Sequence, residues 1–376
     1  MDIYDFIQIN PQHDTTIAQQ LKHQISWLII NGKLQAGDQL PNIYEMAERF
    51  GINLHTVRSA YHKLEKNGLV ETRPGRGTHV LAVDLFQLAR LADTQPTNTI
   101  GVIIPTWSNP FYHAVLQGIE EVVEEDQSLL MLCNTHDDPQ NAWREFARLS
   151  AKGVDGILVV SHNIDEVILS SKPEGLPYKG PPYVTIDWPY THGYSVNLDL
   201  ESAGYQAAKH LISLGHKAIG LITFSVDATN VLAVNSGFFS ALEAAGIPTQ
   251  RDLVAKVPGF SMMDGEAGAR TLLTLNNPPT AIFAISDTLA IGAMQAIKQA
   301  GLAIPTDISV IGFNDIPLAQ LITPALTTIA APSHELGRTA MQLLQKLIKK
   351  EEPQQKQITL PISLTLRQSC GYRNSQ

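Results

Sequence analysis

Basic side chains between residues 41 and 80 have the clearest chemical potential in this 376-residue chain. The segment carries six lysine or arginine residues against four glutamates: Arg49, Arg58, Lys63, Lys66, Arg73 and Arg76 against Glu45, Glu48, Glu65 and Glu71. Guanidinium and ammonium groups bind phosphate oxygens through charge-assisted hydrogen bonds. The segment is therefore a candidate phosphate-binding surface, although an ordinary solvated face can carry the same balance.

The net charge of -9 argues against indiscriminate binding of nucleic acid. Before residue 96 there are nine lysine or arginine residues and ten acidic ones, and the remainder has 18 against 26. The acidic excess thus lies mainly in the C-terminal part of the chain. Any contact with phosphate must come from the local basic segment.

Motifs for catalysis, metal binding and membranes are missing from the sequence. No G-x-G-x-x-G follows the apolar runs TIGVIIP or AIGLIT, and neither a P-loop nor a G-x-S-x-G motif occurs. The two cysteines, Cys133 and Cys370, fit no zinc or disulfide pattern, which is typical of a reducing cytoplasm. We therefore expect a cytoplasmic protein that does not enter the membrane, with no catalytic residue, metal or cofactor.

Three helices and a hairpin must position the basic side chains. Apolar residues recur every three or four positions in residues 15–31, a short helix is predicted for 42–50, and a third for INLHTVRSAYHKLEKNG. The segment LVETRPGRGTHVL alternates as two strands around residues 73–77. Two short helices around a glycine-containing turn, followed by a hairpin, predict a winged helix-turn-helix over residues 1–81.

The segment LQAGDQLPNIYEMAERFGINLHTVRSAYHKLEKNGLVETRPGRGTHV resembles the winged helix of GntR-type regulators. The resemblance implies contacts with double-stranded operator DNA from the two helices and the wing. The implied DNA-binding residues are Tyr44, Leu54, His55, Thr56, Arg58, Arg73, Arg76 and Gly77. Tyr44 and Leu54 stand where these regulators commonly have arginine, so the sequence readout is expected to differ.

After a linker at residues 82–98, the chain alternates strand and helix patterns in two series, which predicts an α/β domain with two lobes. Each lobe is expected to hold a doubly wound parallel sheet. Ligands of such sheets bind beyond the C-terminal ends of the strands. That rule selects Trp107, Asn109, Phe111, Tyr112, His136, Ser161, Asp187, Trp188, Phe224, Asp287 and Asn314 as effector-binding residues.

Residues 99–367 resemble the LacI-type regulator core, which is itself similar to periplasmic sugar-binding proteins. The matching segments include TIGVIIP with SNPFY, KGVDGILVV, PTAIFAISDTLAIGAM and IPTDISVIGFNDIPLAQLITPALTTI. The resemblance implies a periplasmic-binding-protein-like domain at residues 99–376. We expect its first lobe to hold residues 99–191 and 316–330, and its second to hold 192–315 and 331–367. A GntR-type head on a LacI-type core resembles the arabinose-repressor-like regulators.

The resemblance implies a sugar-like effector in the cleft between the lobes. Aromatic faces pack on the apolar side of a sugar ring, and carboxylates accept its hydroxyl hydrogens. Several usual anchors are replaced, because Val234, Ser286, Asn314 and Trp188 stand where the family has arginine, asparagine, an acid and arginine. The substitutions favour a neutral, compact or partly apolar ligand. Asp287 is expected to pair with something, since an unpaired buried carboxylate is costly.

Together these features predict a homodimeric repressor whose operator binding is changed by a small sugar or related polyol. Three alternatives remain open at this point. An enzyme on two doubly wound lobes would need a motif that is missing here. A sugar-binding protein that serves only transport would lack the winged helix, and a regulator with a vestigial effector site would bind DNA constitutively.

Overall fold

The computed structural model describes residues 3–11, 15–30, 33–81, 97–136, 138–160, 180–188, 193–225 and 228–371. Most of the predicted linker, from residue 82 to 96, and the predicted effector residue Ser161 fall outside these ranges. The described parts of residues 1–103, 129–157 and 163–183 form one compact unit. Those of residues 104–128, 158–162 and 184–376 form another.

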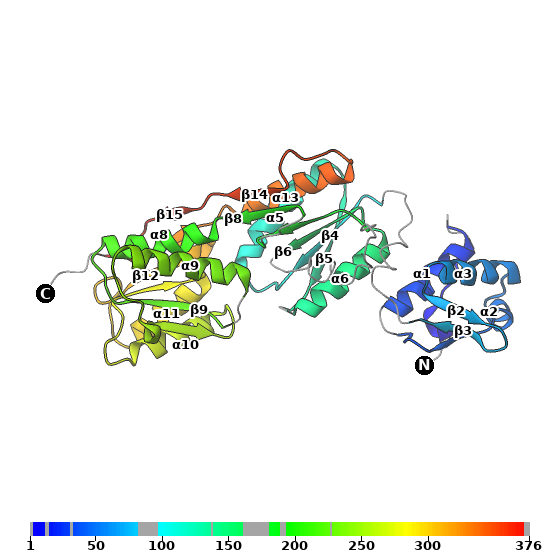
Figure 1. The fold of residues 1–376 in the computed structure, drawn as a ribbon, viewed down its shortest axis with the longest axis horizontal. Helices are drawn as coiled ribbons and strands as arrows, with labels where there is room; N and C mark the ends of the chain where they lie inside the picture. Colours follow the sequence, from blue (N-terminus) through cyan, green and yellow to red (C-terminus); the bar gives the residue numbers. More distant parts are fainter. Residues whose placement is uncertain are drawn as a thin grey trace. The chain divides into compact units, whose positions relative to one another are not determined.

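The predicted winged helix-turn-helix is confirmed at the start of the chain (Figure 1). Its elements are α1 (Ile17–Ile30), β1 (Gln39–Leu40), α2 (Ile43–Phe50), α3 (Leu54–Lys66), β2 (Val70–Arg73) and β3 (Gly77–Val80). Leu21 and Ile25 of α1 share one buried core with Val57 and Leu64 of α3. The three strands lie in the order β1-β3-β2. The sequence predicted β2 and β3 but not the short β1.

The residues before α1 also belong to this head. A 3-10 turn, η1 (Ile3–Phe6), leads to Ile7, which lies in the same buried core. Gln24 of α1 accepts a hydrogen bond from the backbone N–H of Gln8 at 2.7 Å and donates to its carbonyl at 2.6 Å. Gln20, one turn earlier, makes the same pair with Asn10. Two side-chain amides thus hold an extended segment against the helix much as a neighbouring strand would.

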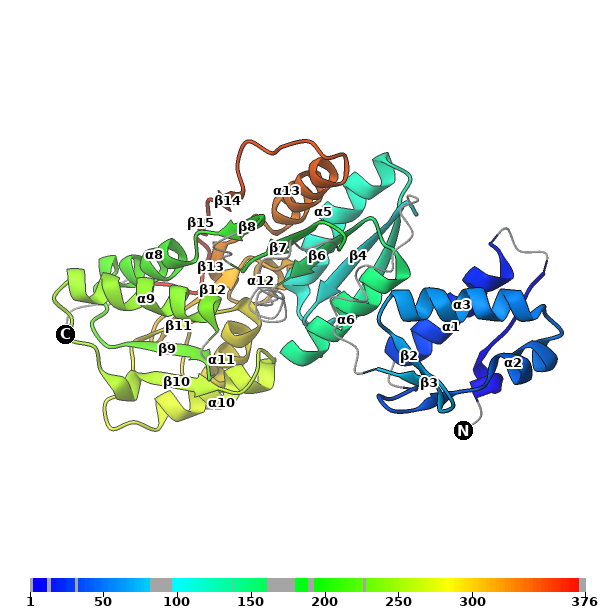
Figure 2. The same ribbon diagram turned by 45° about the vertical axis from the view of Figure 1, so that its right-hand side comes forward.

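The first sheet contains six strands in the order β14-β8-β7-β6-β4-β5. Its strands are β4 (Thr99–Ile104), β5 (Leu129–Asn134), β6 (Gly156–Val160), β7 (Tyr183–Ile186), β8 (Ser195–Leu198) and β14 (Gln357–Leu360). Its helices are α5 (Pro110–Glu125), α6 (Pro139–Lys152) and α13 (Ser333–Ile348). Helices α5 and α13 pack against each other (Figure 2). This sheet and its helices are lobe 1.

The second sheet, also of six strands, has the order β10-β9-β11-β12-β13-β15. Its strands are β9 (Ile219–Phe224), β10 (Val254–Val257), β11 (Ala281–Ala284), β12 (Ser309–Asn314), β13 (Thr327–Ala330) and β15 (Ser363–Thr365). Its helices are α8 (Leu200–Ser213), α9 (Thr229–Ala244), η2 (Arg251–Leu253), α10 (Met262–Leu273), α11 (Asp287–Gln299) and α12 (Pro317–Leu321). Figure 1 shows α8 and α9 on one face, and α10 and α11 on the other. All pairings are parallel except the antiparallel β13–β15 pair. This is lobe 2.

The chain passes between the sheets in a different way from the one predicted. Strand β13 pairs with β12 in lobe 2, so residues 327–330 do not belong to lobe 1. Helix α13 packs on α5, and β14 pairs with β8, so most of residues 331–360 lie in lobe 1 rather than lobe 2. Strand β8 also lies in lobe 1, and only β15 returns to lobe 2. An alternating pattern locates strands, but it does not reveal which sheet a strand joins after a long crossover.

Three helix pairs in the lobes pack through reciprocal glycines. A Cβ atom on Gly118 of α5 would lie 1.9 Å from the carbonyl oxygen of His334, and one on Gly337 of α13 would lie 1.9 Å from that of Val115. The other two pairs have the same arrangement, with Gly204 and Gly237 between α8 and α9, and Gly265 and Gly292 between α10 and α11. Only a residue without a side chain allows such close backbone approach.

We therefore expect Gly337→Ala to destabilise lobe 1. Overpacking costs about 1–3 kcal/mol, and here the clashing atoms are backbone atoms that cannot rotate away. The higher helix propensity of alanine, worth about 1 kcal/mol, offsets only part of this cost. Urea unfolding should show a net loss of about 1–2 kcal/mol. The exposed Gln342→Ala on the same helix serves as control and should stay within about 0.5 kcal/mol of wild type. If Gly337→Ala and Gln342→Ala have the same free energy of unfolding, α5 and α13 can move apart without cost and the close glycine contact is not required.

Candidate functional site

The exposed side of the head carries most of the predicted DNA-binding residues. On α3, Val57, Ala60, Tyr61 and Leu64 point into the core. Leu54, His55 and Arg58 are exposed on the same helix, and Thr56 is half-buried. Tyr44, in the first turn of α2, is 64% exposed, although aromatic side chains more often pack inside. The structure therefore leaves the first turns of α2 and α3 free for a partner.

Asparagines fix the starts of these two helices. Asn42 accepts hydrogen bonds from the N–H groups of Tyr44 and Glu45, and the Glu45 carboxylate accepts from Asn42 N in return. Asn53 accepts from His55 N at 2.8 Å. Caps of this kind hold the first helical turn in place. The exposed side chains of α2 and α3 therefore project from ordered helix ends.

The tip of the wing is shaped by its neighbours. Gly77 has φ 86°, and a Cβ atom there would lie 2.4 Å from Gln39 Nε2. Gln39 donates to the carbonyl of Arg76, whose oxygen also contacts His79 Nε2 at 2.8 Å. Arg73 pairs with Glu71 at 2.8 Å, which partly neutralises it. Arg76 is exposed and forms no ion pair within the described chain, so it is the more available cation of the two.

In lobe 1, the predicted effector residues follow the C-terminal ends of β4, β5 and β7. Trp107 is 43% exposed. Asn109 caps α5 by accepting from Phe111 N at 3.1 Å. Phe111 and Tyr112 are almost completely buried, with ring centroids 5.4 Å apart, so both rings serve mainly as core. Of these four, Trp107 offers the largest accessible apolar surface.

Two other predicted residues of lobe 1, His136 and Asp187, have positive φ angles. His136 is exposed, and its backbone N–H donates to Asn134 Oδ1 at 2.9 Å. Asp187 is nearly buried, directly after β7, and Trp188 beside it is half-buried. His136 and Asp187 have φ of 55° and 53°, values that side-chain-bearing residues seldom adopt. Such strain is found at functional turns more often than elsewhere.

In lobe 2, the sequence reasoning missed one aromatic residue. Phe224 ends β9 and is half-buried, and its ring centroid lies 4.8 Å from that of Phe260. Phe260 comes three residues after β10, so the same rule for strand ends could have selected it. The two rings form an aromatic pair beside the C-terminal ends of two neighbouring strands.

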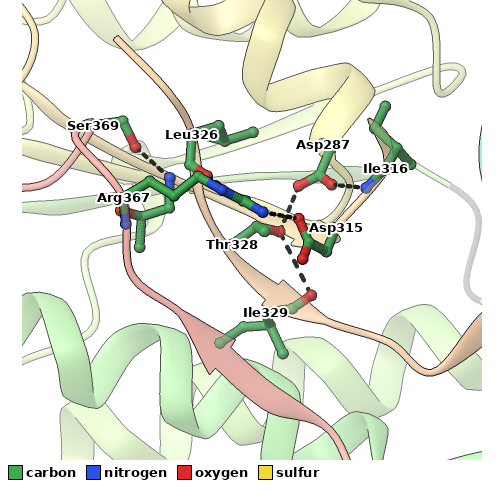
Figure 3. A network of polar contacts seen from close by, with 9 residues as sticks. Asp287, Asp315, Ile316, Leu326, Thr328, Ile329, Arg367 and Ser369 are labelled. Carbon is green, nitrogen blue, oxygen red and sulfur yellow. Dashed lines mark hydrogen bonds and ion pairs between the residues drawn. The ribbon is translucent and has the colours of Figure 1, made fainter. Parts of the chain in front are cut away.

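Asp287, at the start of α11, has no solvent-exposed surface (Figure 3). Its Oδ1 accepts from Thr328 Oγ1 at 2.5 Å, and its Oδ2 accepts from Ile316 N at 2.8 Å. Gly312 makes room for it, because a Cβ atom there would lie 2.2 Å from Oδ1. The expected partner of this carboxylate is therefore the protein itself. In this structure the carboxylate is not available to an effector.

Burial raises the pKa of Asp287 to about 6, against the lowering effect of the hydrogen bonds from Thr328 and Ile316. Nearby Asp315 raises the pKa further, and Arg367 lowers it. Desolvation is the dominant cause, because burial removes the water that would otherwise stabilise the ionised carboxylate. Ser286, just before it, caps α11 by accepting from Leu289 N at 3.2 Å.

Asn314 and Asp315 complete this edge of lobe 2. Both have left-handed backbone conformations, with φ of 111° and 58°. Asp315 Oδ1 pairs with Arg367 Nη2 at 2.6 Å (Figure 3). Arg367 and Thr328 lie far from Asp315 in the sequence, and no local motif indicates them.

In the described part of the chain no three histidine, cysteine, aspartate or glutamate side chains come together as a metal site.

No helix among the described residues is both long and apolar enough to cross a membrane.

Models of two protein families match the chain. The model for bacterial regulatory proteins of the gntR family matches residues 17–80. The model for the periplasmic binding protein-like domain matches residues 208–370. The two matches cover the head and most of lobe 2, together with α13 and β14 of lobe 1.

Curated relatives extend the similarity to nearly the whole chain. The HTH-type transcriptional regulator DegA of Bacillus subtilis is 34% identical over 341 residues, which are 89% of this chain and 99% of DegA. The ribose operon repressor of Haemophilus influenzae is 33% identical over 289 residues, 75% of this chain and 84% of the repressor.

Solved structures of transcription regulators show the same similarity. A LacI family transcriptional regulator from Enterococcus faecium with bound ribose is 33% identical, with TM-score 0.65, over 73% of this chain and 98% of that one. The transcription regulator CcpA of Lactococcus lactis is 30% identical, with TM-score 0.66, over 73% and 100%. These relatives are regulators rather than enzymes. The chain therefore belongs to the LacI family of transcription regulators, with a GntR-type winged helix as its DNA-binding head.

Proposed function

We propose that this regulator is a repressor that binds double-stranded operator DNA as a homodimer and releases it when a small sugar-like effector binds to the lobes. One observation carries the proposal. The same chain joins a winged helix with free recognition surfaces to two sheets whose C-terminal edges hold aromatic and hydrogen-bonding residues. The named repressors among its relatives support repression as the direction of control.

The DNA contacts are assigned to the first turns of α2 and α3 and to the wing. Arg58 is the exposed cation in the N-terminal half of the recognition helix, and Arg76 is the available cation of the wing. Leu54 and His55 take part at base edges, and Tyr44 with Thr56 contacts the backbone. Arg73 and Gly77 shape the wing. Two heads related by a two-fold axis would bind two operator half-sites, which is why a homodimer is proposed.

The effector is assigned to the strand ends of both lobes. Trp107, the Phe224–Phe260 pair and Trp188 supply apolar surface for a sugar ring, and Asn109, His136, Ser161, Asp187 and Asn314 supply polar groups. Val234, where the family has arginine, is buried in α9, so no guanidinium is available from that position. This favours a neutral, compact ligand, and the relative with bound ribose makes pentoses the first class to examine.

We infer that Asp287 supports this edge from inside. Its carboxylate holds Ile316 N, directly after Asn314 and Asp315, and so fixes the turn that presents Asn314. Phe111 and Tyr112 contribute in a similar way through packing, since both are buried.

Arg58→Ala should weaken operator binding by about 1–3 kcal/mol, roughly 5- to 150-fold, because a direct phosphate or base contact is lost. The affinity would be measured by fluorescence anisotropy on a DNA site selected from a random library by the wild-type protein. The matched control is Arg251→Ala, which removes an exposed arginine of lobe 2 and should leave the affinity unchanged. If Arg58→Ala also leaves it unchanged, Arg58 lies outside the interface.

A thermal-shift screen of pentoses, hexoses, disaccharides, polyols and nucleosides, led by D-ribose, should identify a stabilising compound. A ligand at about 100 times its dissociation constant adds about 2.7 kcal/mol to the native state. Trp107→Ala should lose the shift. Trp27→Ala should keep it, because Trp27 has a similar exposure but lies in the head. The active compound should also lower operator affinity. A panel without any shift would remove the effector from the proposal, and tighter DNA binding would reverse the direction of control.

The Asp287 carboxylate should make the stability of lobe 2 depend on pH. Its pKa is raised from 3.8 to about 6 in the folded chain, so the folded state binds the proton more tightly than the unfolded state does. The favourable contribution is complete below about pH 4 and is lost as pH rises through 6. Relative to Asp287→Asn, the wild type should lose on the order of 2–3 kcal/mol of unfolding free energy over this range. Urea unfolding of both proteins from pH 4 to 7.5 measures the difference. If the difference in unfolding free energy between the two proteins does not change with pH, the pKa of Asp287 is not raised in the folded chain.

A further inference from the structure

Two of the three places where the chain passes between the sheets are connected to the turn at residues 314–316. The passages lie between β8 and α8, between β13 and α13, and between β14 and β15. The backbone N–H of Ala331, in the second passage, donates to the carbonyl of Asn314 at 3.4 Å. Arg367, just after the third passage and β15, pairs with Asp315. The turn that bears Asn314 is thus held by segments that lead directly to lobe 1.

Arg367 contacts two separate segments of lobe 2, the turn at Asp315 and the start of β13 at Leu326 and Thr327 (Figure 3). Its Nη2 lies 2.6 Å from Asp315 Oδ1, and its Nη1 donates to the carbonyl of Leu326 at 2.9 Å. Its backbone N–H donates to Thr327 Oγ1 at 2.9 Å. The side chain is only 17% exposed, so the ion pair is largely shielded from water. A guanidinium can serve two acceptors at once in a fixed fork, whereas an ammonium cannot match that geometry.

The following residues attach the same segment to the start of β13. Gln368 N donates to the carbonyl of Ala325 at 2.9 Å, and Ser369 Oγ accepts from Thr327 N at 2.8 Å. These bonds keep the backbone near residue 367 in place whether or not the arginine side chain is present. The side chain then joins this fixed segment to the turn at 314–316 through Asp315, and it adds one hydrogen bond to the Leu326 carbonyl.

The turn needs such support because two successive residues with side chains adopt positive φ. Asn314 and Asp315 are not glycines, and their conformations persist only where the surroundings hold them. Asp287 holds the turn at Ile316 N, and Arg367 holds it at the Asp315 side chain. Asn314 lies immediately before this anchored pair.

We propose that Arg367 is a positioning residue that keeps Asn314 oriented at the effector edge and links this edge to the second and third passages between the sheets. The proposal rests on the proposed function for the role of Asn314 in effector binding. Through Arg367, a ligand that moves the turn also moves the segments around residues 331 and 367. The reverse holds as well, because energetic coupling is reciprocal.

Amide hydrogen exchange of the full-length protein tests the positioning role without any ligand. Arg367→Met should speed exchange at Ile316 and Ala331 at least tenfold, and Arg367→Lys should give an intermediate increase. Peptides from β9, β11 and the head should exchange as in wild type. Arg338→Met, which removes an exposed pair with Glu335, is the control and should change neither site. Unchanged exchange in Arg367→Met, or faster exchange throughout lobe 2, would overturn the proposal.

The link to the effector is tested by titration calorimetry with D-ribose, or with whichever compound of the panel stabilises the wild type. Arg367→Met should weaken binding at least tenfold, while operator affinity without the compound stays unchanged. The Asp315→Asn variant should show a similar loss, and the double variant should add little to either. Additive losses, or full affinity in Arg367→Met, would overturn the link. If no compound binds the wild type, the effector part of the proposed function fails, and the exchange result alone decides whether Arg367 positions the turn.

Discussion

A carboxylate that is withdrawn from water must receive hydrogen bonds from the protein, and in lobe 2 this requirement joins α11 to β13 and to the turn after β12. Asp287 sits at the start of α11 and takes its bonds from β13 and from the turn after β12. Three elements that are distant in sequence are thereby held in one arrangement. An aliphatic side chain of the same size would leave the N–H of Ile316 without its acceptor. The strained turn beside it can exist because the anchoring group cannot move.

The head and the α/β alternation could be predicted from sequence because their signals are local. Asn42, Asn53 and Gly51 mark helix ends directly, and strand ends follow from apolar runs. The passages between the sheets, the glycine pairs and Arg367 could not be predicted. Each depends on which distant segments meet, and no spacing in the sequence carries that information. Asp287 shows the limit of prediction from sequence, because the need of its carboxylate for a partner was predictable and the identity of that partner was not.

The distribution of charge reconciles DNA binding with an acidic chain. The exposed arginines Arg58 and Arg76 of the head lie on α3 and at the wing tip, while the lobes carry the acidic excess. Operator DNA therefore meets a locally basic surface, and the remainder of the protein disfavours loose attachment to nucleic acid. The proposed effector site does not depend on positive charge. It relies on aromatic faces and neutral hydrogen-bonding groups, so the two functions use separate chemistry in separate parts of one chain.

The positions of β14 and β15 have a consequence for biosynthesis. Both sheets remain unfinished until residues 357–371 have left the ribosome, because β14 is an edge strand of lobe 1 and β15 is an edge strand of lobe 2. The head, in contrast, is complete within its first 81 residues and can fold while the rest is still being translated. Each nascent chain thus acquires its DNA-binding surface before the two sheets of the lobes are completed. A ribosome stalled near residue 350 would hold a folded head attached to two sheets that lack their final strands.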